Sequence, residues 1–201
     1  MKVDFKKTLP AFKARKNKLE IVNIPDQSYL MIDGQGSPGG ETYAHALTQI
    51  YPVAYGLKFF SKLELGKDYV VPPLEGLWWA DDMASFTTAR DKSKWRWTTL
   101  ILLPDWIDNS MVEQAKQKAR AKVSDVDQIR METLSEGQCV QTLHVGSFDN
   151  EGPILHEMHE QFIPDNDLKM TGKHHEIYFS DFRKTQPEKL RTILRQPVLP
   201  K

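Results

Sequence analysis

Hydrophobic and polar residues change their spacing several times along the chain, and each spacing predicts a different kind of element. Short apolar blocks and runs of alternating character predict β-strands, because successive side chains of a strand point to opposite faces. Apolar residues that recur every three or four positions predict helices. Strands are predicted over residues 19–25, 28–34, 74–80, 95–104, 128–134, 138–148 and 174–181, and helices over 41–65, 111–122 and 152–162.

Proline, glycine and polar runs interrupt this pattern and predict how the elements are joined. The glycine-rich segment 34–40 lies between a strand and a helix, but its spacing fits neither the dinucleotide-binding nor the Walker motif, so it predicts a plain connection. Pro52 and Gly56 predict a kink or a break in the helix over 41–65. The polar run 81–93 predicts a turn, and the segment 135–137 predicts a hairpin.

The order of these elements predicts the fold class. Each half of the chain is interpreted as strand, strand, helix, strand, strand, although the two halves share no evident sequence identity. Two such units can pack with approximate two-fold symmetry into one α+β body, with a groove between them. The charged segment 1–18 predicts a solvated N-terminal lead-in, and residues 19–201 predict the folded domain.

Charge and cysteine content exclude several classes of protein. Lys and Arg together number 27, as do Asp and Glu, and this balance argues against direct binding of nucleic acid. Cys139 is the single cysteine, so neither an intramolecular disulfide nor a cysteine metal cluster can form. No apolar run approaches the roughly 20 residues that span a bilayer, and the N-terminus has no signal-like apolar region. The sequence therefore predicts a soluble, cytoplasmic protein.

Tryptophan is concentrated in the predicted strands 74–80 and 95–104, which hold four of the five in the chain. So many large rings exceed what a small core hides on one side of a sheet, and some should face a groove that accepts a flat, apolar ligand. Alternation places Trp78 and Trp79 on opposite faces, so one of the two should line the groove. The further candidates for ligand contact are Trp97, Tyr55 and His144.

The predicted strand 174–181 places a carboxylate in an apolar, aromatic run. Alternation puts His174, Glu176 and Tyr178 on one face of the strand, with His175 and its neighbours at every second position on the other. Glu176 is then either a ligand anchor or proton-transfer group, or an ordinary glutamate on the outer face of a sheet.

Metal chemistry and nucleophilic catalysis lack support in the sequence. His156 and His159 are three residues apart, whereas zinc peptidases place two histidines four apart with a glutamate directly after the first. His174 and His175 are adjacent and should point to opposite faces of their strand, so they cannot share an ion without distortion. The chain has no Gly-x-Ser-x-Gly motif, and Cys139 is predicted to be a core residue. We expect no metal and no cofactor.

Several segments together resemble the GyrI-like small-molecule-binding family. They are PLEGLWW at 73–79, HVGSFDNEGP at 144–153, and HHEIYFSDFRK at 174–184 with its continuation PEKLRTILR at 187–195. The resemblance extends from about Leu19 to the C-terminus, and its last segment is the most specific. It implies two strand-helix-strand-strand modules related by pseudo-two-fold symmetry, with a ligand groove between them.

The resemblance also implies a site and a function. In that family the groove is lined by aromatic residues and holds a glutamate, whose position Glu176 occupies. Members are drug-sensing domains of transcription regulators or stand-alone toxin-binding proteins, and the absence of a helix-turn-helix segment favours the stand-alone class. The segment 77–79 and the chain length resemble a branch that hydrolyses the cyclopropane of DNA-alkylating natural products of the yatakemycin type.

Three functions follow as alternatives from this resemblance: a cyclopropanoid cyclopropyl hydrolase, a non-catalytic drug-sequestering protein, and a ligand sensor for a regulator. All three imply a hydrophobic small-molecule partner. In the hydrolase, Glu176 would orient or deprotonate the attacking water, and Tyr178 would donate to the carbonyl that becomes a phenolate.

Overall fold

The computed structural model describes residues 2–81 and 91–201. The chain divides into two compact units, each built from more than one stretch of sequence. The first unit comprises Met1–Thr8, Gln27–Pro72 and Gly76–Leu134, and the second comprises Leu9–Asp26, Pro73–Glu75 and Ser135–Lys201. Of the turn predicted over 81–93, residues 82–90 lie outside the described residues.

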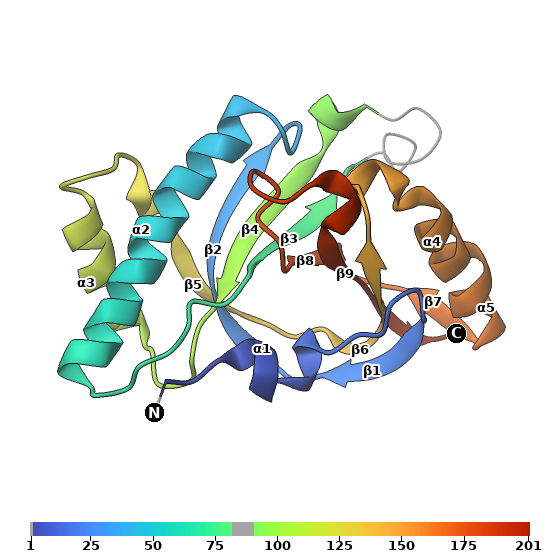
Figure 1. Ribbon diagram of the computed structural model, residues 1–201, viewed down its shortest axis with the longest axis horizontal. Helices are drawn as coiled ribbons and strands as arrows, with labels where there is room; N and C mark the ends of the chain where they lie inside the picture. The colour runs from blue at the N-terminus through green and yellow to red at the C-terminus, as the bar shows by residue number, and fades with distance from the viewer. Residues whose placement is uncertain (1, 82–90) are drawn as a thin grey trace. The chain divides into compact units, whose positions relative to one another are not determined.

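The first unit contains antiparallel strands around a central, buried strand β2 (Figure 1). Strand β2 (Gln27–Gln35) pairs with β4 (Arg96–Leu102) on one side and with β5 (Arg130–Leu134) on the other. Strand β3 (Leu74–Trp79) is the other neighbour of β4, and its first two residues belong to the second unit. The run Tyr29–Ile32 is buried, as expected of a strand with neighbours on both edges.

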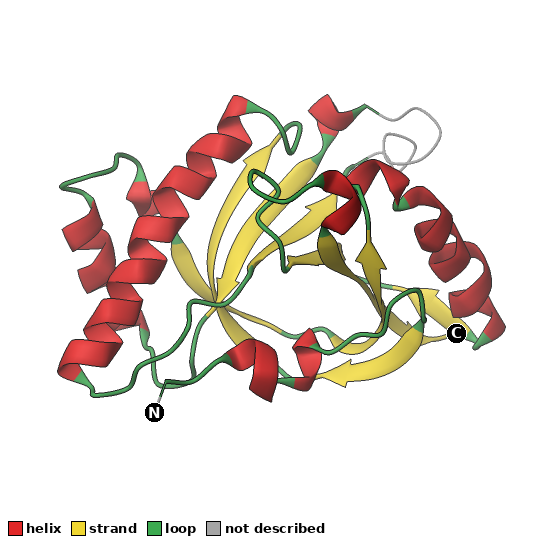
Figure 2. Cartoon of the chain, viewed as in Figure 1, coloured by secondary structure: helices red, strands yellow, loops and turns green. Residues whose placement is uncertain are grey.

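The longer helices of the first unit, α2 (Glu41–Glu64) and α3 (Asn109–Ala119), are among the red ribbons in Figure 2. Helix α2 packs against β2 and against α3. Of the two alternatives predicted at Pro52 and Gly56, a kink or a break, the break is wrong, because the helix continues through Pro52. Proline removes one backbone hydrogen bond, whereas Ile50 and Val53 on either side of it are fully buried and hold the helix in place.

The second unit contains a longer antiparallel arrangement in the order β1-β6-β9-β8. Its strands are β1 (Glu20–Ile24), β6 (Gly137–Val145), β7 (Leu168–Met170), β8 (His174–Tyr178) and β9 (Arg191–Pro200). Strand β7 pairs with the end of β9. The interpretation of the segment 174–181 as the last strand is therefore wrong, since β9 follows it and pairs with β6, β7 and β8.

The turn predicted at residues 135–137 does not form a hairpin. Strand β5, before it, pairs with β2, whereas β6, after it, pairs with β1 and β9. Gly137 has a φ of 63°, which favours glycine. The short segment therefore joins two strands with different partners, and it carries Glu136, whose side chain is buried.

A helical stretch covers part of the second unit's sheet. It consists of α4 (Gly152–His156), a π-helical segment η6 (Glu157–Phe162) and α5 (Ile163–Asp165). Met158 and Ile163 are buried against Val140, Leu194 and Val198. The apolar stripe predicted for this helix is confirmed. The short helices elsewhere are α1 (Phe5–Thr8), η1 (Pro10–Phe12), η3 (Lys92–Lys94), η4 (Val126–Gln128), η5 (Phe148–Asn150) and η7 (Pro187–Lys189).

The N-terminal lead-in is not solvated throughout. Ala11 and Phe12 are buried, and Lys16 forms a bridge with Leu143 of β6. The predicted fold class is confirmed, because the chain is an α+β protein whose named strand pairs are antiparallel. Within residues 2–81 and 91–201, no helix is both long and apolar enough to span a membrane.

Candidate functional site

Strand register in the second unit places the candidate site on one face of β8. Glu176 lies opposite Leu194 of β9, and Tyr178 lies opposite Thr192. His144 of β6 lies opposite Thr192 on its other side. Because directly paired residues point to the same face of a sheet, Tyr178, Thr192 and His144 form a row across three strands.

The carboxylate of Glu176 is held between two neighbours on its own strand. The hydroxyl of Tyr178 donates a hydrogen bond to Oε2 at 2.7 Å, and Nε2 of His174 lies 3.5 Å from Oε1. The side chain of Glu176 is only 16% exposed. Glu176 is therefore not an ordinary surface glutamate, and its remaining hydrogen-bonding capacity is that of an acceptor.

Aromatic and imidazole rings surround the Tyr178 side of this carboxylate. The ring of Phe148 packs edge-on against Tyr178, with centroids 5.8 Å apart and planes at 84°. Nε2 of His144 lies 3.1 Å from the carbonyl oxygen of Ser147, in the turn that carries Phe148. His144 thus supports the turn that positions Phe148, and its proposed contact with a ligand stays a prediction.

The predicted tryptophans lie in the first unit, where several of them pack on Tyr43 of α2. Trp78 stacks on Tyr43 with centroids 5.6 Å apart, and Trp97 meets the same ring edge-on at 5.1 Å. Trp95 packs edge-on against Trp78 at 6.0 Å. Trp78 and Trp97 are buried, so a large part of this aromatic content is core packing.

Gly34 explains how Trp97 is buried completely. A Cβ atom on Gly34 would lie 2.1 Å from Cη2 of Trp97, so the indole rests directly on the backbone of the paired strand. Trp79 is only partly buried and has the more accessible ring of the Trp78–Trp79 pair. Tyr55 is 48% exposed on α2 and packs beside Tyr51, with centroids 6.4 Å apart.

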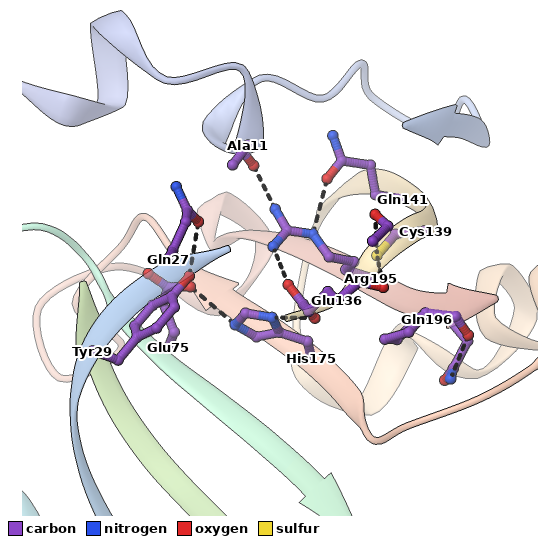
Figure 3. A network of polar contacts seen from close by, with 12 residues as sticks. Ala11, Gln27, Tyr29, Glu75, Glu136, Cys139, Gln141, His175, Arg195 and Gln196 are labelled. Carbon is purple, nitrogen blue, oxygen red and sulfur yellow. Dashed lines mark hydrogen bonds and ion pairs between the residues drawn. The ribbon is translucent and has the colours of Figure 1, made fainter. Parts of the chain in front are cut away.

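The opposite face of β8 carries a buried charge network that the sequence did not reveal (Figure 3). Register aligns Gln141, Arg195 and His175 across β6, β9 and β8. His175 lies 2.9 Å from Glu75 through Nε2 and 2.9 Å from Glu136 through Nδ1. Arg195 lies 2.9 Å from the other oxygen of Glu136. We name these four side chains, Glu75, Glu136, His175 and Arg195, the charge network.

Arg195 joins the network to the N-terminal segment and to β6. Its Nε donates to Oε1 of Gln141 at 3.1 Å, and its second terminal nitrogen donates to the carbonyl oxygen of Ala11 at 2.6 Å. A buried guanidinium is tolerated only when such donors are satisfied. Arg195 is therefore accommodated in the buried strand β9 because its donors are satisfied.

In the charge network, burial and the neighbouring charges shift the pKa values in opposite directions, and the effect of the charges is larger. Burial disfavours the imidazolium of His175, but the adjacent Glu136 and Glu75 outweigh it and raise its pKa to about 9. Burial alone would raise the pKa of Glu136, but His175 and Arg195 lower it to about 2. At neutral pH His175 is therefore a cation and Glu136 is an anion.

The free energy of unfolding should decrease as pH rises from 6.5 to 9. The pKa of His175 is 6.5 in an ordinary environment and about 9 in the fold. The stabilisation of the fold by protonated His175 is therefore complete below pH 6.5 and is lost as the pH rises through 9. Urea unfolding between these pH values measures the effect, which is on the order of a few kcal/mol. His175→Gln should remove the slope, and an unchanged slope in that variant would contradict the assignment.

Other candidate chemistry is absent from the described part of the chain. Over residues 2–81 and 91–201, no group of three or more His, Cys, Asp or Glu side chains is arranged so that it could hold a metal ion. Cys139 is buried, which confirms its prediction as a core residue. Burial and the nearby Glu136 raise the pKa of its thiol to about 12, so it is not a thiolate at neutral pH.

An antiparallel α+β fold with a largely buried carboxylate beside aromatic rings is suited to binding small molecules. The chain matches the GyrI-like small molecule binding domain over residues 17–199. The protein therefore belongs to the GyrI-like family. A search of curated proteins finds no match.

Solved structures of similar sequence span the whole chain. An uncharacterized conserved protein from Listeria innocua is 41% identical, with a TM-score of 0.90, and the match covers 98% of this chain and 100% of that one. A second protein from the same organism, described as a hydrolase, is 40% identical with a TM-score of 0.85 over 98% and 100% of the two chains. A third, also described as a hydrolase, is 39% identical with a TM-score of 0.88 over 99% and 100%.

Proposed function

We propose that this protein binds flat hydrophobic compounds and hydrolyses the cyclopropane ring of DNA-alkylating natural products of the yatakemycin type. Such an activity would protect the cell that contains it. The observation that carries the proposal is the carboxylate of Glu176, held at 2.7 Å by Tyr178 and mostly shielded from solvent. Full-length relatives about 40% identical that are described as hydrolases support the enzymatic alternative.

The reaction requires little of the protein. In the substrate a cyclopropane is fused to a conjugated dienone, and water attacks its methylene carbon. The carbon–carbon bond breaks, its electron pair moves to the carbonyl oxygen, and the ring becomes an aromatic phenolate. The water gives up one proton and the phenolate takes one up, so the product is the substrate plus one water. Release of ring strain and gain of aromaticity drive the reaction.

Glu176 is suited to the first proton transfer. An ionised carboxylate accepts hydrogen bonds only, so it can orient the attacking water and take its proton. Tyr178 donates its hydroxyl to Glu176, which fixes the direction in which the carboxylate points. Fixing this group in advance removes reorientation from the barrier. Donation by Tyr178 to the substrate carbonyl requires that this bond be exchanged during the reaction.

The tryptophan-rich strands supply the proposed ligand contacts. A flat, conjugated ligand gains most from stacking on large aromatic side chains. We assign this contact to Trp79 before Trp78, because Trp78 is buried whereas Trp79 is only partly buried. Trp97 is enclosed by Tyr43 and Gly34 and contributes through packing of the unit.

Counting product molecules tests the proposal. The protein is incubated at sub-stoichiometric amount with a cyclopropane-fused cyclohexadienone alkylator, and the ring-opened water adduct is followed by mass spectrometry. Several adducts per protein molecule are the expected result, with the isotope of labelled water appearing in the new alcohol. Protection limited to one ligand per protein, with no adduct, would instead establish the non-catalytic sequestering protein.

A further inference from the structure

A row of polar side chains in the second unit extends beyond the Glu176–Tyr178 pair. His174 precedes Glu176 on the same face of β8, and His159 reaches it from the helical stretch above. The two imidazole rings are edge-to-face, with centroids 6.2 Å apart and planes at 85°. Both histidines and Glu176 belong to the second unit, so their arrangement is set within one compact body.

The imidazole nitrogens of this row are buried but lack conventional hydrogen bonds. Among the described residues, neither Nδ1 nor Nε2 of His174 has a hydrogen-bond partner, and the same holds for Nε2 of His159. Buried polar atoms are normally paired, so unpaired ones need a reason. The polar atom of Glu176 closest to His174 is Oε1, 3.5 Å from its Nε2, slightly beyond ordinary hydrogen-bond length.

The helix above the row has an unusual form at this point. Residues Glu157–Phe162 form a π-helical segment, which places His159 over His174 while Met158 remains in the core. Such segments are rare and are frequently found at functional sites. Burial and, to a smaller extent, the neighbouring His174 lower the pKa of His159 to about 4, so His159 is neutral near pH 7.

We infer that His174 is a positioning residue for Glu176. Nε2 of His174 lies 3.5 Å from Oε1 while the Tyr178 hydroxyl donates to Oε2 at 2.7 Å, so a proton on Nε2 of His174 would clamp the carboxylate from both sides. Each oxygen of a carboxylate has two lone pairs: the hydrogen bond from Tyr178 uses one on Oε2, and the inferred contact with His174 takes one on Oε1. The remaining lone pairs of the ionised carboxylate can only accept hydrogen bonds. The group that meets Glu176 must therefore be a donor, such as a water or an ammonium or N–H group of a ligand.

This inference rests on the proposed role of Glu176, but imidazole spectra of the protein alone test it separately. In nitrogen-15 NMR, the proton of His174 should reside on Nε2, with the resonance assigned by its loss in His174→Gln. Glu176→Gln should shift that resonance, whereas Glu188→Gln, at an exposed glutamate of η7, should not. A proton on Nδ1, or a resonance insensitive to Glu176→Gln, would overturn the inference.

Steady-state kinetics of two His174 variants provide a second test of the inference. His174→Phe keeps a flat ring without a donor, and we expect kcat to fall by about tenfold to a hundredfold with KM unchanged. His174→Gln keeps an N–H donor and should restore most of that loss, which a merely structural role would not produce. Equal kcat in His174→Phe and the wild type would refute the clamp. If the wild type shows no turnover, the proposed function fails and the spectra alone decide the inference.

Discussion

Replacing Glu176 by glutamine will reduce cyclopropane ring opening by about a hundredfold to ten-thousandfold in kcat/KM, the usual contribution of a general base. Glutamine has nearly the same shape and its carbonyl oxygen can still accept the hydrogen bond of Tyr178, so the strand is preserved. It cannot accept the proton of the attacking water. The decrease therefore measures proton transfer separately from folding.

Two further variants define what the Glu176→Gln result means. Tyr178→Phe leaves the carboxylate in place but removes the donor to Oε2, so we expect a smaller loss than for Glu176→Gln. Glu188→Gln changes an exposed glutamate and should leave the rate unaltered. Steady-state measurement of ring-opened product checks all three. Undiminished turnover in both Glu176→Gln and Glu176→Ala would remove this carboxylate from the mechanism.

Arg195→Met will lower the free energy of unfolding by about 3–5 kcal/mol, because it leaves Glu136 buried with one cation in place of two. The same change leaves acceptors on Gln141 and Ala11 without their donor. Methionine fills much of the volume of the arginine stem, so loss of charge and hydrogen bonds dominates the effect. Urea unfolding at pH 6, where His175 is protonated, measures it.

Arg15→Met is the matched control for Arg195→Met in the same unit. Arg15 also pairs with a glutamate, Glu20, but the arginine side chain is largely exposed. Ion pairs at the surface contribute little, since water and salt screen them. A loss in Arg195→Met no larger than that in Arg15→Met would show that the charge network does not stabilise the fold.

The sequence predicted best those elements whose signal is local. The alternation in the segment 174–181 correctly separates the face of Glu176 and Tyr178 from the face of His175, and the stripe of the helix over 152–162 is confirmed. Such patterns follow directly from the geometry of a strand or a helix. A break at Pro52, one of the two predicted alternatives, does not occur, because tertiary burial of α2 outweighs one lost hydrogen bond.

Long-range pairing explains the principal misses. Strand β9 contains Arg195 and Pro197, which are unusual residues in a buried strand. Such residues fit there only because of partners far away in sequence, such as Ala11 for Arg195. The charge network joins Glu75, Glu136, His175 and Arg195, and no local pattern predicts that such residues meet. A signal was present at Gly34, since a glycine inside a strand often marks close approach of another group, in this case Trp97.

The charge network also bears on how strand β8 finds its correct register. If β8 shifted by one residue against β9, His175 would move to the other face of the sheet and Glu176 would lie opposite Arg195. The carboxylate of Glu176 would then take the place of the His175 cation between Glu75 and Glu136. Three buried anions beside one guanidinium are strongly unfavourable. The network thus penalises the misregistered chain, and the same penalty keeps Glu176 and Tyr178 together on the face of β8 opposite the charge network.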